Sequence, residues 1–550
     1  MLETYDVIII GSGAGGLGAA VPLAQARKKV LVCEQHEVPG GWTHSFTLQG
    51  YRFSPGVHYI GGLQEGGSLR KVYEGLGVSR DLVFCEINPD GYDHIVVGDE
   101  QFDIPKGKEA FAARLKERFP HETEGIDGYL NTITGMMDNL KNLGIPKSKD
   151  EIHQELRDVS GILKWSLRSA QNLVEHFVSD PMLIAILCGQ AGDHGMPPSQ
   201  VPAFLHVGIA QHYFKGAYYP LGGGFVIPRA FVRALKRAGG EIRLETRVER
   251  ILLKDGKAIG IRLEDGEEIG AKYVISNADP EVTFGKLVGR ENLSEKLIRK
   301  LDNTTYSVSA LSLFFAVDMD LRAAGMDSGN YWFYEHENVD ELYQLGLTDH
   351  VLNAESPSML FMTVTTLKDP SKMHTKGVTQ GHHTCEAFTF VSYDAFTKWA
   401  SEATGAHSAA YEGLKEELAW RMFRAIEKRI PGISNHVVFW NLGTPLTNAH
   451  YINSTRGNLY GTAKNSKQIG PRAFPTKTEI EGLLMCGAST RNFGVSGATK
   501  TGLDAAKEIL KCTNADLLSQ KGPPLKIYPA EDLSQWPENL QRKIDKGKKK

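Results

Sequence analysis

A glycine-rich turn lies close to the amino terminus of the 550-residue chain. In VIIIGSGAGGLGAA, Gly11, Gly13 and Gly16 have the G-x-G-x-x-G spacing typical of dinucleotide binding. The first glycine permits a tight turn, the second lets the backbone approach a diphosphate, and the third lets a helix pack closely on a strand. Ala14 and Gly15 share this turn, where the free N–H groups of a helix start would face the phosphates. The turn therefore predicts a pyrophosphate site.

An acidic residue follows at the spacing that such a site requires. A second short apolar strand, Val30 to Cys33, ends at Glu34, and a ribose-binding carboxylate is expected roughly twenty residues after the first glycine. A carboxylate accepts hydrogen bonds from both ribose hydroxyls and would repel a 2′-phosphate. The order of strand, glycines, helix, strand and acid thus favours FAD or NAD over NADP.

The elements that must position these residues are spread along the chain. The apolar, β-branched run from Tyr5 to Ile10 predicts a buried parallel strand. Further on, the sequence predicts a helix at 226–238, a hairpin set of strands at 241–244, 247–253 and 258–263, and a closing strand at 274–276. Near the end, GLLMCGASTRNFGVSGATKTGLDAAKEIL predicts a strand, a glycine turn and a helix from about Ala498.

The fold class that we expect is α/β. Residues 1–80, 221–300 and 455–515 are predicted to form one Rossmann-type domain from discontinuous segments. Residues 81–220 and 301–454 would form a second, α+β domain, with strands at 308–317, 359–367, 387–393 and 437–442. The apolar segment 162–187 predicts a pair of core-facing helices, with a lipid-dipping surface as the alternative. Residues 516–550 are predicted to form a carboxy-terminal extension with a basic tail.

Composition excludes several classes of function. The net charge of -3 and the pI of about 6.7 provide no field that would attract nucleic acid. The six cysteines show no paired spacing, which argues against a disulfide framework and for a reducing compartment. His382 and His383 beside Cys385 lack zinc-ligand spacing and favour a solvated loop, so no metal is expected.

The termini bear on localisation. A first strand at about residue 5 leaves no room for a signal peptide, and no apolar run approaches the ~20 residues that span a bilayer. We expect a cytoplasmic protein. Its last residues, KIDKGKKK, carry lysines that anionic lipid would attract, which leaves peripheral contact with a membrane open.

Several segments, taken in order, resemble the phytoene desaturase and carotenoid isomerase flavoproteins, and the stretch GVHYIGG is most similar to the retinol saturase branch of that family. The segments are GSGAGGLGAA, EVPGGWTHSFTLQGYRFSPGVHYIGGL, PPSQVPAFLHVGIAQHYFKGAYYPLGGG, VISNADP, TPLTNAHY and EGLLMCGAST. The resemblance implies FAD, a Rossmann-type FAD domain, a substrate domain like that of amine oxidases, and long polyene isoprenoid substrates.

The resemblance also implies roles for single residues. It places the glycine turn on the pyrophosphate, Glu34 on the adenosine ribose, and the backbone of Val248 at the adenine. Further residues would lie under the cofactor or approach its flavin end: Gly40, Gly41, Gly487, Val495 and Ser496. Two positions depart from the pattern, because Trp42 stands where many relatives have arginine and Ala488 where many have an acid. Either backbone groups and water replace that carboxylate on the ribityl chain, or FAD binds more weakly.

The chain shows no catalytic triad, paired-acid motif or nucleophile signature, as expected where a flavin supplies the redox chemistry. His58 and Tyr59 follow the second glycine motif and Tyr219 precedes the third, so these three are the candidate residues near the flavin. An imidazole readily exchanges a proton near neutral pH, and His58 could protonate a substrate carbanion. The alternative is that His58 bonds backbone carbonyls in a buried turn.

Saturation of a polyene double bond is the expected reaction, with redox-neutral cis–trans isomerisation or desaturation as the alternatives. No second strand–glycine–helix unit for NADPH is evident, so electrons would come from a separate donor or from transient NAD(P)H contact. An amine-oxidase-like enzyme would need a cation-accepting pocket. A non-enzymatic prenyl-lipid carrier on the same fold is another alternative, against which the intact glycines and Glu34 argue.

Overall fold

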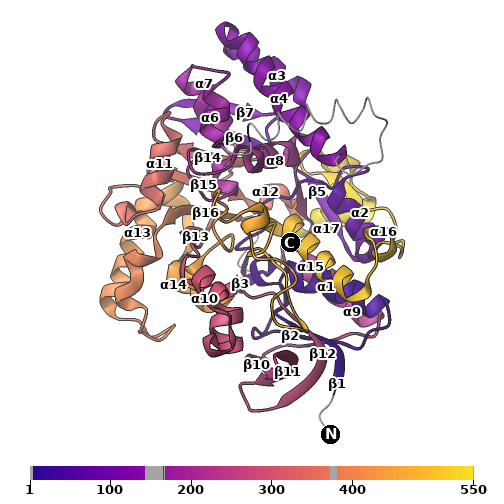
Figure 1. Ribbon diagram of the computed structural model, residues 1–550. Helices are drawn as coiled ribbons and strands as arrows, with labels where there is room; N and C mark the ends of the chain where they lie inside the picture. Colours follow the sequence, from indigo (N-terminus) through magenta and orange to yellow (C-terminus); the bar gives the residue numbers. More distant parts are fainter. Residues whose placement is uncertain (1–3, 143–164, 166–167, 372–380, 549–550) are drawn as a thin grey trace.

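Two large sheets dominate the structure, a computed structural model that describes residues 4–142, 165, 168–371 and 381–548 (Figure 1). At the centre of the first sheet, β1 (Thr4–Ile10) pairs in parallel with β2 (Val30–Cys33) on one side and β12 (Glu268–Ser276) on the other. Both faces of β2 and of β1 from Val7 onward are covered, which is why residues 7–10 and 30–33 are continuously apolar. The first predicted strand is confirmed.

The remaining strands of this sheet come from distant parts of the chain. Its order is β10-β11-β12-β1-β2-β9, and β18 also pairs with β12. These strands are β9 (Glu241–Arg243), β10 (Val248–Lys254), β11 (Lys257–Leu263) and β18 (Leu483–Met485). The sheet therefore joins three separated segments. The residue boundaries of the two domains stay a prediction.

Three helices pack on the first sheet: α1 (Ala14–Gln25), α9 (Val226–Arg237) and α15 (Gly494–Leu510). Helices α1 and α15 approach so closely that a Cβ on Gly18 would lie 2.7 Å from the Thr499 carbonyl oxygen, and one on Gly502 would lie 2.1 Å from that of Gly15. Figure 1 shows them side by side. Small residues at this contact bring the end of the chain against the amino-terminal turn.

The second sheet has the order β17-β13-β16-β15-β14-β6-β7. Its strands are β6 (Asp93–Val97), β7 (Glu100–Ile104), β13 (Ser309–Val317), β14 (Asn330–Tyr334), β15 (Met359–Val364), β16 (His383–Val391) and β17 (Val437–Gly443). Helices α11 (Val339–Gly346) and α13 (Ala409–Glu427) pack against it. Its core residues include Phe315 and Phe423, whose rings meet edge to face.

A helical group stands at the top of Figure 1, next to β6 and β7. It consists of α3 (Lys108–Arg118), α4 (Thr123–Asn142), α6 (Ala170–Glu175), α7 (Pro181–Cys188) and α8 (Ala203–Tyr213). The predicted helix pair at 162–187 corresponds to α6 and α7, most of whose apolar side chains are buried in the core; residues 162–164, 166 and 167 lie outside the described residues.

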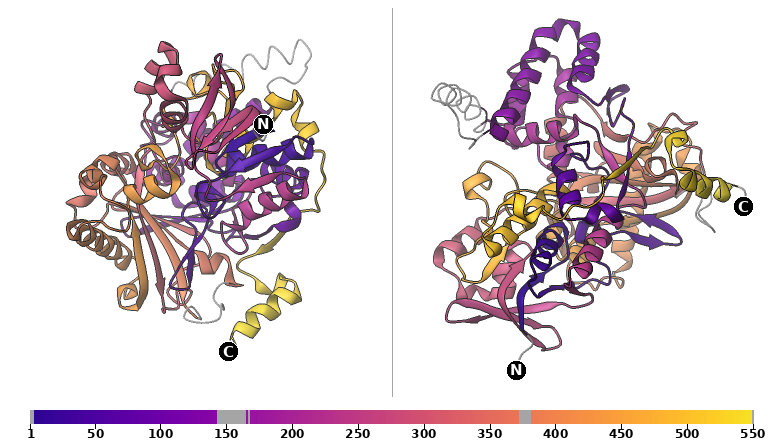
Figure 2. Two further views of the ribbon diagram at one scale, coloured as in Figure 1. Left: turned by 90° about the horizontal axis from the view of Figure 1, so that it is seen from below. Right: turned by 90° about the vertical axis from the view of Figure 1, so that its right-hand side faces the viewer.

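The carboxy-terminal segment is more ordered than a solvated tail. β19 (Lys526–Pro529) forms a small sheet with β5 (Val83–Glu86) and β8 (Tyr218–Pro220). Trp536 is buried against Cys85, and the chain then continues into α17 (Glu538–Lys548), at the edge of the molecule in Figure 2. Among the described helices, none has both the length and the apolar character needed to cross a bilayer.

Shorter elements complete the fold. They are the hairpin β3 (Phe46–Leu48) and β4 (Tyr51–Phe53), and the helices α2 (Ser68–Gly75), α10 (Glu295–Asp302), α12 (Thr365–Lys368), α14 (Pro445–Ile452) and α16 (Asn514–Leu517).

Four sequence-based expectations are corrected. β9 does not join the hairpin set but extends the sheet beside β2 in parallel, because α9 returns it to that edge. The expected strand at 359–367 ends at residue 364, where α12 begins. The helix expected from Ala498 starts at Gly494. His383 and Cys385 belong to the buried strand β16 rather than to a loop.

Candidate active site

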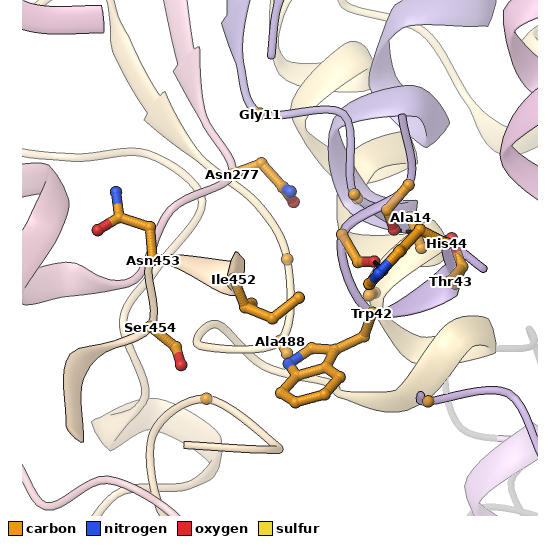
Figure 3. A pocket seen from close by; sticks show the side chains of 18 of the residues that line it. Gly11, Ala14, Trp42, Thr43, His44, Asn277, Ile452, Asn453, Ser454 and Ala488 are labelled. Carbon is orange, nitrogen blue, oxygen red and sulfur yellow. Dashed lines mark hydrogen bonds between the residues drawn. The ribbon is translucent and has the colours of Figure 1, made fainter. Parts of the chain in front are cut away.

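One cavity runs from the carboxyl end of β1 to the face of the second sheet (Figure 3). At one end it is lined by the glycine turn, and at the other by Ala310 and Ser312 of β13, Phe361 of β15 and Phe388 of β16. The cavity thus joins the two sheets. A ligand that filled it would contact residues from almost the whole length of the chain.

The glycine turn forms one wall of the cavity, and a side chain at most of its glycines would collide with neighbouring atoms. Gly11 has a φ of +90°, which favours glycine over residues with a Cβ. A Cβ on Gly13 would lie 2.6 Å from Asn277 Nδ2, and one on Gly15 would lie 2.7 Å from the backbone nitrogen of Gly487. Gly16 lies behind this wall, where a Cβ would come within 2.0 Å of the Gly11 carbonyl oxygen. Gly16 therefore serves helix packing.

The start of α1 suits an anionic ligand. Gly13 is the N-cap residue and provides no side-chain cap, and the first turn contains no acidic residue. The first backbone N–H groups of a helix have no partner within it, and the helix dipole adds a partial positive charge there. Gly13, Ala14 and Gly15 line the cavity. This arrangement fits a pyrophosphate without a lysine or arginine.

Glu34 is fixed at the end of β2 and is almost fully buried while lining the cavity. Its Oε2 accepts hydrogen bonds from the backbone nitrogen of Ser12 at 2.9 Å and from Ser12 Oγ at 2.5 Å, and its Oε1 accepts one from the His36 nitrogen at 3.0 Å. These donors orient the carboxylate, occupy both lone pairs of Oε2 and leave one lone pair open on Oε1. The residue can therefore accept a hydrogen bond from a ribose hydroxyl group through Oε1.

A short helical turn after β2 brings a large ring into the cavity. Gly40 and Gly41, with φ of 129° and 53°, begin this turn, and the Gly40 nitrogen donates to Ser12 Oγ at 3.0 Å. Trp42 follows, and Figure 3 shows its indole pointing into the cavity toward Ile452. Ala488 lines the same cavity. The two positions that depart from the family pattern thus contribute to one space.

Most of the other predicted cofactor residues also line the cavity. Val248, Gly487 and Val495 do so, together with Ala498 one turn further along α15. Ser496 and Gly16 are not among the lining residues that the structure describes. Because α15 already begins at Gly494, Val495 and Ala498 share one helical face and Ser496 points elsewhere. The roles of these residues in binding stay predictions.

The three candidate catalytic residues separate into two groups. His58 and Tyr59 line the cavity, whereas Tyr219, on β8, is fully buried and is not among the described lining residues. The Tyr219 ring instead lies 5.7 Å from Lys368 Nζ. His58 Nδ1 is 3.1 Å from Glu386 Oε2, and the Ser54 nitrogen donates to Glu386 Oε1 at 2.6 Å. Direct contact of Tyr219 with a ligand in this cavity is therefore not supported.

Sequence reasoning missed several residues of the site. Asn277 lies between the glycine turn and Gly487, Glu386 holds His58, and Asp193 lines the cavity beside Tyr59. Asn277 was visible within the motif VISNADP. Glu386 and Asp193 carry no local signal, because the residues that they contact lie 328 and 134 positions away in sequence.

A buried lysine supports the segment around Ala488. Lys464 Nζ donates to the carbonyl oxygens of Ala488 at 2.6 Å and Thr490 at 3.1 Å. Burial lowers the pKa of Lys464 to about 7. A side chain from a different segment thus fixes the backbone at the position where the expected carboxylate is missing.

Comparisons with known proteins agree with this geometry. The chain is 30% identical over 531 residues to all-trans-retinol 13,14-reductase of Danio rerio, covering 92% of this chain and 86% of that one. It is 28% identical over 502 residues to a chloroplastic prolycopene isomerase of Arabidopsis thaliana, covering 88% and 79%. These relatives confirm the resemblance that the motifs indicated.

Solved structures agree on the fold. An oxidoreductase from Methanosarcina mazei aligns with a TM-score of 0.61 at 16% identity, covering 91% of this chain and 99% of that one. A putrescine oxidase variant aligns with a TM-score of 0.58 at 14% identity, covering 93% and 100%. The Rossmann-type and amine-oxidase-like fold class is thereby confirmed. The sequence pattern of the flavin containing amine oxidoreductases matches residues 14–343, which is more than half of the chain. This protein therefore belongs to the family of flavin containing amine oxidoreductases, and it is an oxidoreductase with FAD as its cofactor.

Proposed function

We propose that this enzyme saturates double bonds of an apolar polyene of the retinoid or carotenoid kind. The observation that carries the proposal is the aromatic end of the cavity. Phe361 and Phe388 stack with ring centroids 4.7 Å apart, and the His58 ring lies 5.1 Å from that of Phe361. A flat apolar chain would lie well against such a wall, gaining about 0.8 kcal/mol for each buried CH₂ group.

The same cavity would hold the cofactor at its other end. We propose that the start of α1 binds the pyrophosphate, that Glu34 binds the adenosine ribose, and that Gly487 and Ala488 approach the flavin. FAD supplies hydride chemistry when bound. The chain's own residues hold the two molecules together and exclude water.

Relatives support the substrate class. The most similar curated proteins include all-trans-retinol 13,14-reductases from fish, rat and human, at 27–30% identity. Isomerisation is the second candidate, because prolycopene isomerases match at 28% identity over nearly the same span. A carrier without a working flavin is the least supported alternative, because the phosphate turn and Glu34 are intact.

The experiment that tests the proposal uses the purified protein loaded with FAD. The reduced enzyme is incubated anaerobically with all-trans-retinol or with prolycopene, and the products are analysed by mass spectrometry. A product two mass units heavier supports saturation. An unchanged mass with a shifted retention time would show that the reaction is isomerisation and not saturation. Turnover of an aliphatic amine instead of a polyene would refute the substrate class. A protein that stays colourless after addition of FAD would indicate the carrier.

We further propose that electrons come from a separate donor or from transient NAD(P)H contact, and that the enzyme is cytoplasmic and meets its substrate at a membrane surface. The lysine-rich end of the chain supports the second point, since anionic lipid attracts clustered lysines. Sedimentation with anionic vesicles but not with neutral ones would support it. Equal binding to both kinds of vesicle would contradict a role for the lysines.

A further inference from the structure

Three oxygen-bearing side chains form a chain that leads from the cavity into the core. Asp193 lines the cavity, Tyr59 lies next to it, and Asp93 is fully buried behind them on β6. The Tyr59 hydroxyl lies 2.6 Å from Asp193 Oδ2 and 3.1 Å from Asp93 Oδ2. Both carboxyl groups are therefore within hydrogen-bonding distance of one phenol.

The number of protons in this arrangement is limited. A tyrosine has one O–H hydrogen and can donate it to one acceptor at a time. If both carboxyl groups were ionised, one of the two short oxygen–oxygen contacts would contain no hydrogen, and two negative charges would share a buried site. A proton on one carboxyl group resolves this, because that group then donates to the phenol while the phenol donates to the other.

The surrounding donors decide which group holds the proton. Asp93 accepts hydrogen bonds from Gln190 Nε2 at 2.6 Å, Asn330 Nδ2 at 2.9 Å and Trp332 Nε1 at 3.3 Å. Lys368 bonds Asn330 and brings a positive charge to the same side. Such donors stabilise an ionised carboxylate. Asp93 is accordingly the ionised member.

Asp193 has much less support for a negative charge. The described residues give it one recorded donor, the Tyr59 hydroxyl. Burial, followed by the charge of Asp93, raises the pKa of Asp193 well above its usual value. Burial also raises the pKa of Asp93, but its hydrogen bonds limit that rise to about 6. Asp193 is therefore the protonated member, and it is the one that faces the cavity.

The phenol between the two acids is held rigidly. Its ring stacks on that of Tyr213 with centroids 4.2 Å apart and planes 6° apart. Lys368 Nζ lies 5.8 Å from the centroid of the Tyr59 ring and donates to the His58 carbonyl oxygen at 2.7 Å. A fixed phenol holds the Asp193 carboxyl group at one place in the cavity wall.

We propose that Asp193 is the acid that delivers a proton to the substrate carbon, with Tyr59 and Asp93 as positioning residues. The proposal rests on the saturation proposed above. Saturation of one double bond adds a hydride equivalent, two electrons and one proton from the reduced cofactor, to one carbon. The Asp193 O–H group turns from the phenol to the substrate, the O–H bond breaks, and the proton forms the new C–H bond at the neighbouring carbon. After the product leaves, water that enters the cavity returns a proton to Asp193.

The first test measures whether Asp193 is protonated and needs no catalytic turnover. Infrared difference spectra of Asp193→Asn against the wild-type holoenzyme at pH 7 should show loss of a protonated-carboxyl band that shifts in D₂O. The substitution keeps the size of the side chain and, through the amide N–H, a donor to the Tyr59 oxygen, and Asp99→Asn, at a fully exposed position, is the matched control. No such band, or one unchanged in Asp193→Asn, would overturn the proposal.

The second test follows the proton into the product. In D₂O the wild-type enzyme should place solvent deuterium at one carbon. Asp193→Asn should lower kcat about 100-fold or more with little change in KM, and should remove the loss of activity at high pH. Full activity in Asp193→Asn, or the same defect only in His58→Gln, would assign the acid elsewhere. If the wild-type enzyme leaves polyenes unchanged, the proposed function fails, and the infrared band still decides the protonation of Asp193.

Discussion

Replacement of Gly15 by alanine tests whether the narrow space around the glycine turn is essential for binding the cofactor. Gly15 lies in the first turn of α1 and lines the cavity. A Cβ there would lie 2.5 Å from Asn277 Oδ1 and 2.7 Å from the Gly487 nitrogen. Asn277 can rotate away, but Gly487 meets the new methyl group with its backbone. Either the start of α1 or the backbone at Gly487 must therefore move.

The size of the effect follows from two opposing terms. Alanine in a helix is favoured over glycine by about 1 kcal/mol, whereas overpacking a close contact costs about 1–3 kcal/mol. Gly413→Ala in α13 isolates the first term, because a Cβ there would have no neighbour within 4 Å. The helix preference largely cancels between the two variants. We expect Gly15→Ala to be less stable than Gly413→Ala by about 1–3 kcal/mol.

The assay is titration of the apoprotein with FAD, followed by flavin fluorescence, together with denaturant unfolding of both variants. If this displacement makes the free energy of FAD binding less favourable by about 1.4 kcal/mol, the Kd for FAD rises tenfold. We expect at least this increase for Gly15→Ala and no increase for Gly413→Ala. Equal FAD affinity and equal stability in the two variants would refute the reasoning.

Three further predictions concern other parts of the molecule. Glu34→Gln should raise the Kd for FAD about 10- to 100-fold, since hydrogen bonds to a charged group contribute about 1.5–3 kcal/mol, while Glu37→Gln, at an exposed position, should not. Phe388→Ala should lower kcat/KM for a polyene about tenfold or more, because contact with a stacked ring is lost, with FAD content unchanged in the absorption spectrum. Burial acts to lower the pKa of His94, but hydrogen bonds to Asp103 and Asp327 outweigh it and raise the value to about 9. The stabilisation by protonated His94 is complete below the unfolded pKa of about 6.5 and is lost as the pH rises through 9. In urea unfolding, His94→Gln should therefore lower the free energy of unfolding by about 2–3 kcal/mol at pH 6 and by clearly less at pH 10.

The part of the cavity that we propose for the pyrophosphate could be predicted because its signals are local. The strand β1, the glycine turn, α1, β2 and Glu34 form one continuous stretch, and each glycine acts through its own backbone. Steric limits on φ and on close approach are properties of single residues, so they are visible in a single sequence. The resemblance of six ordered motifs then selected FAD over NAD.

Elements whose position depends on distant partners were predicted less well. β9 was assigned to a hairpin with β10, although it pairs with β2 more than two hundred residues earlier in the chain. The start of α15 was placed one turn too late, because two glycines near its beginning resembled a loop. Tyr219 was expected near the flavin, yet β8 pairs with β5 and directs it into the core.

By itself, the sequence determined the class of fold and the glycine turn that we propose as the cofactor site, since both depend on short runs of apolar residues and on glycine sterics. Only the tertiary structure decided which polar side chains meet in the cavity. Asp93 comes next to Asn330 through the parallel register of β6 and β14, and Tyr59 reaches Asp193 through packing of the helical group. Sheet register and helix packing join residues that no spacing in the chain connects, and the acid that we assign to the reaction depends on those contacts.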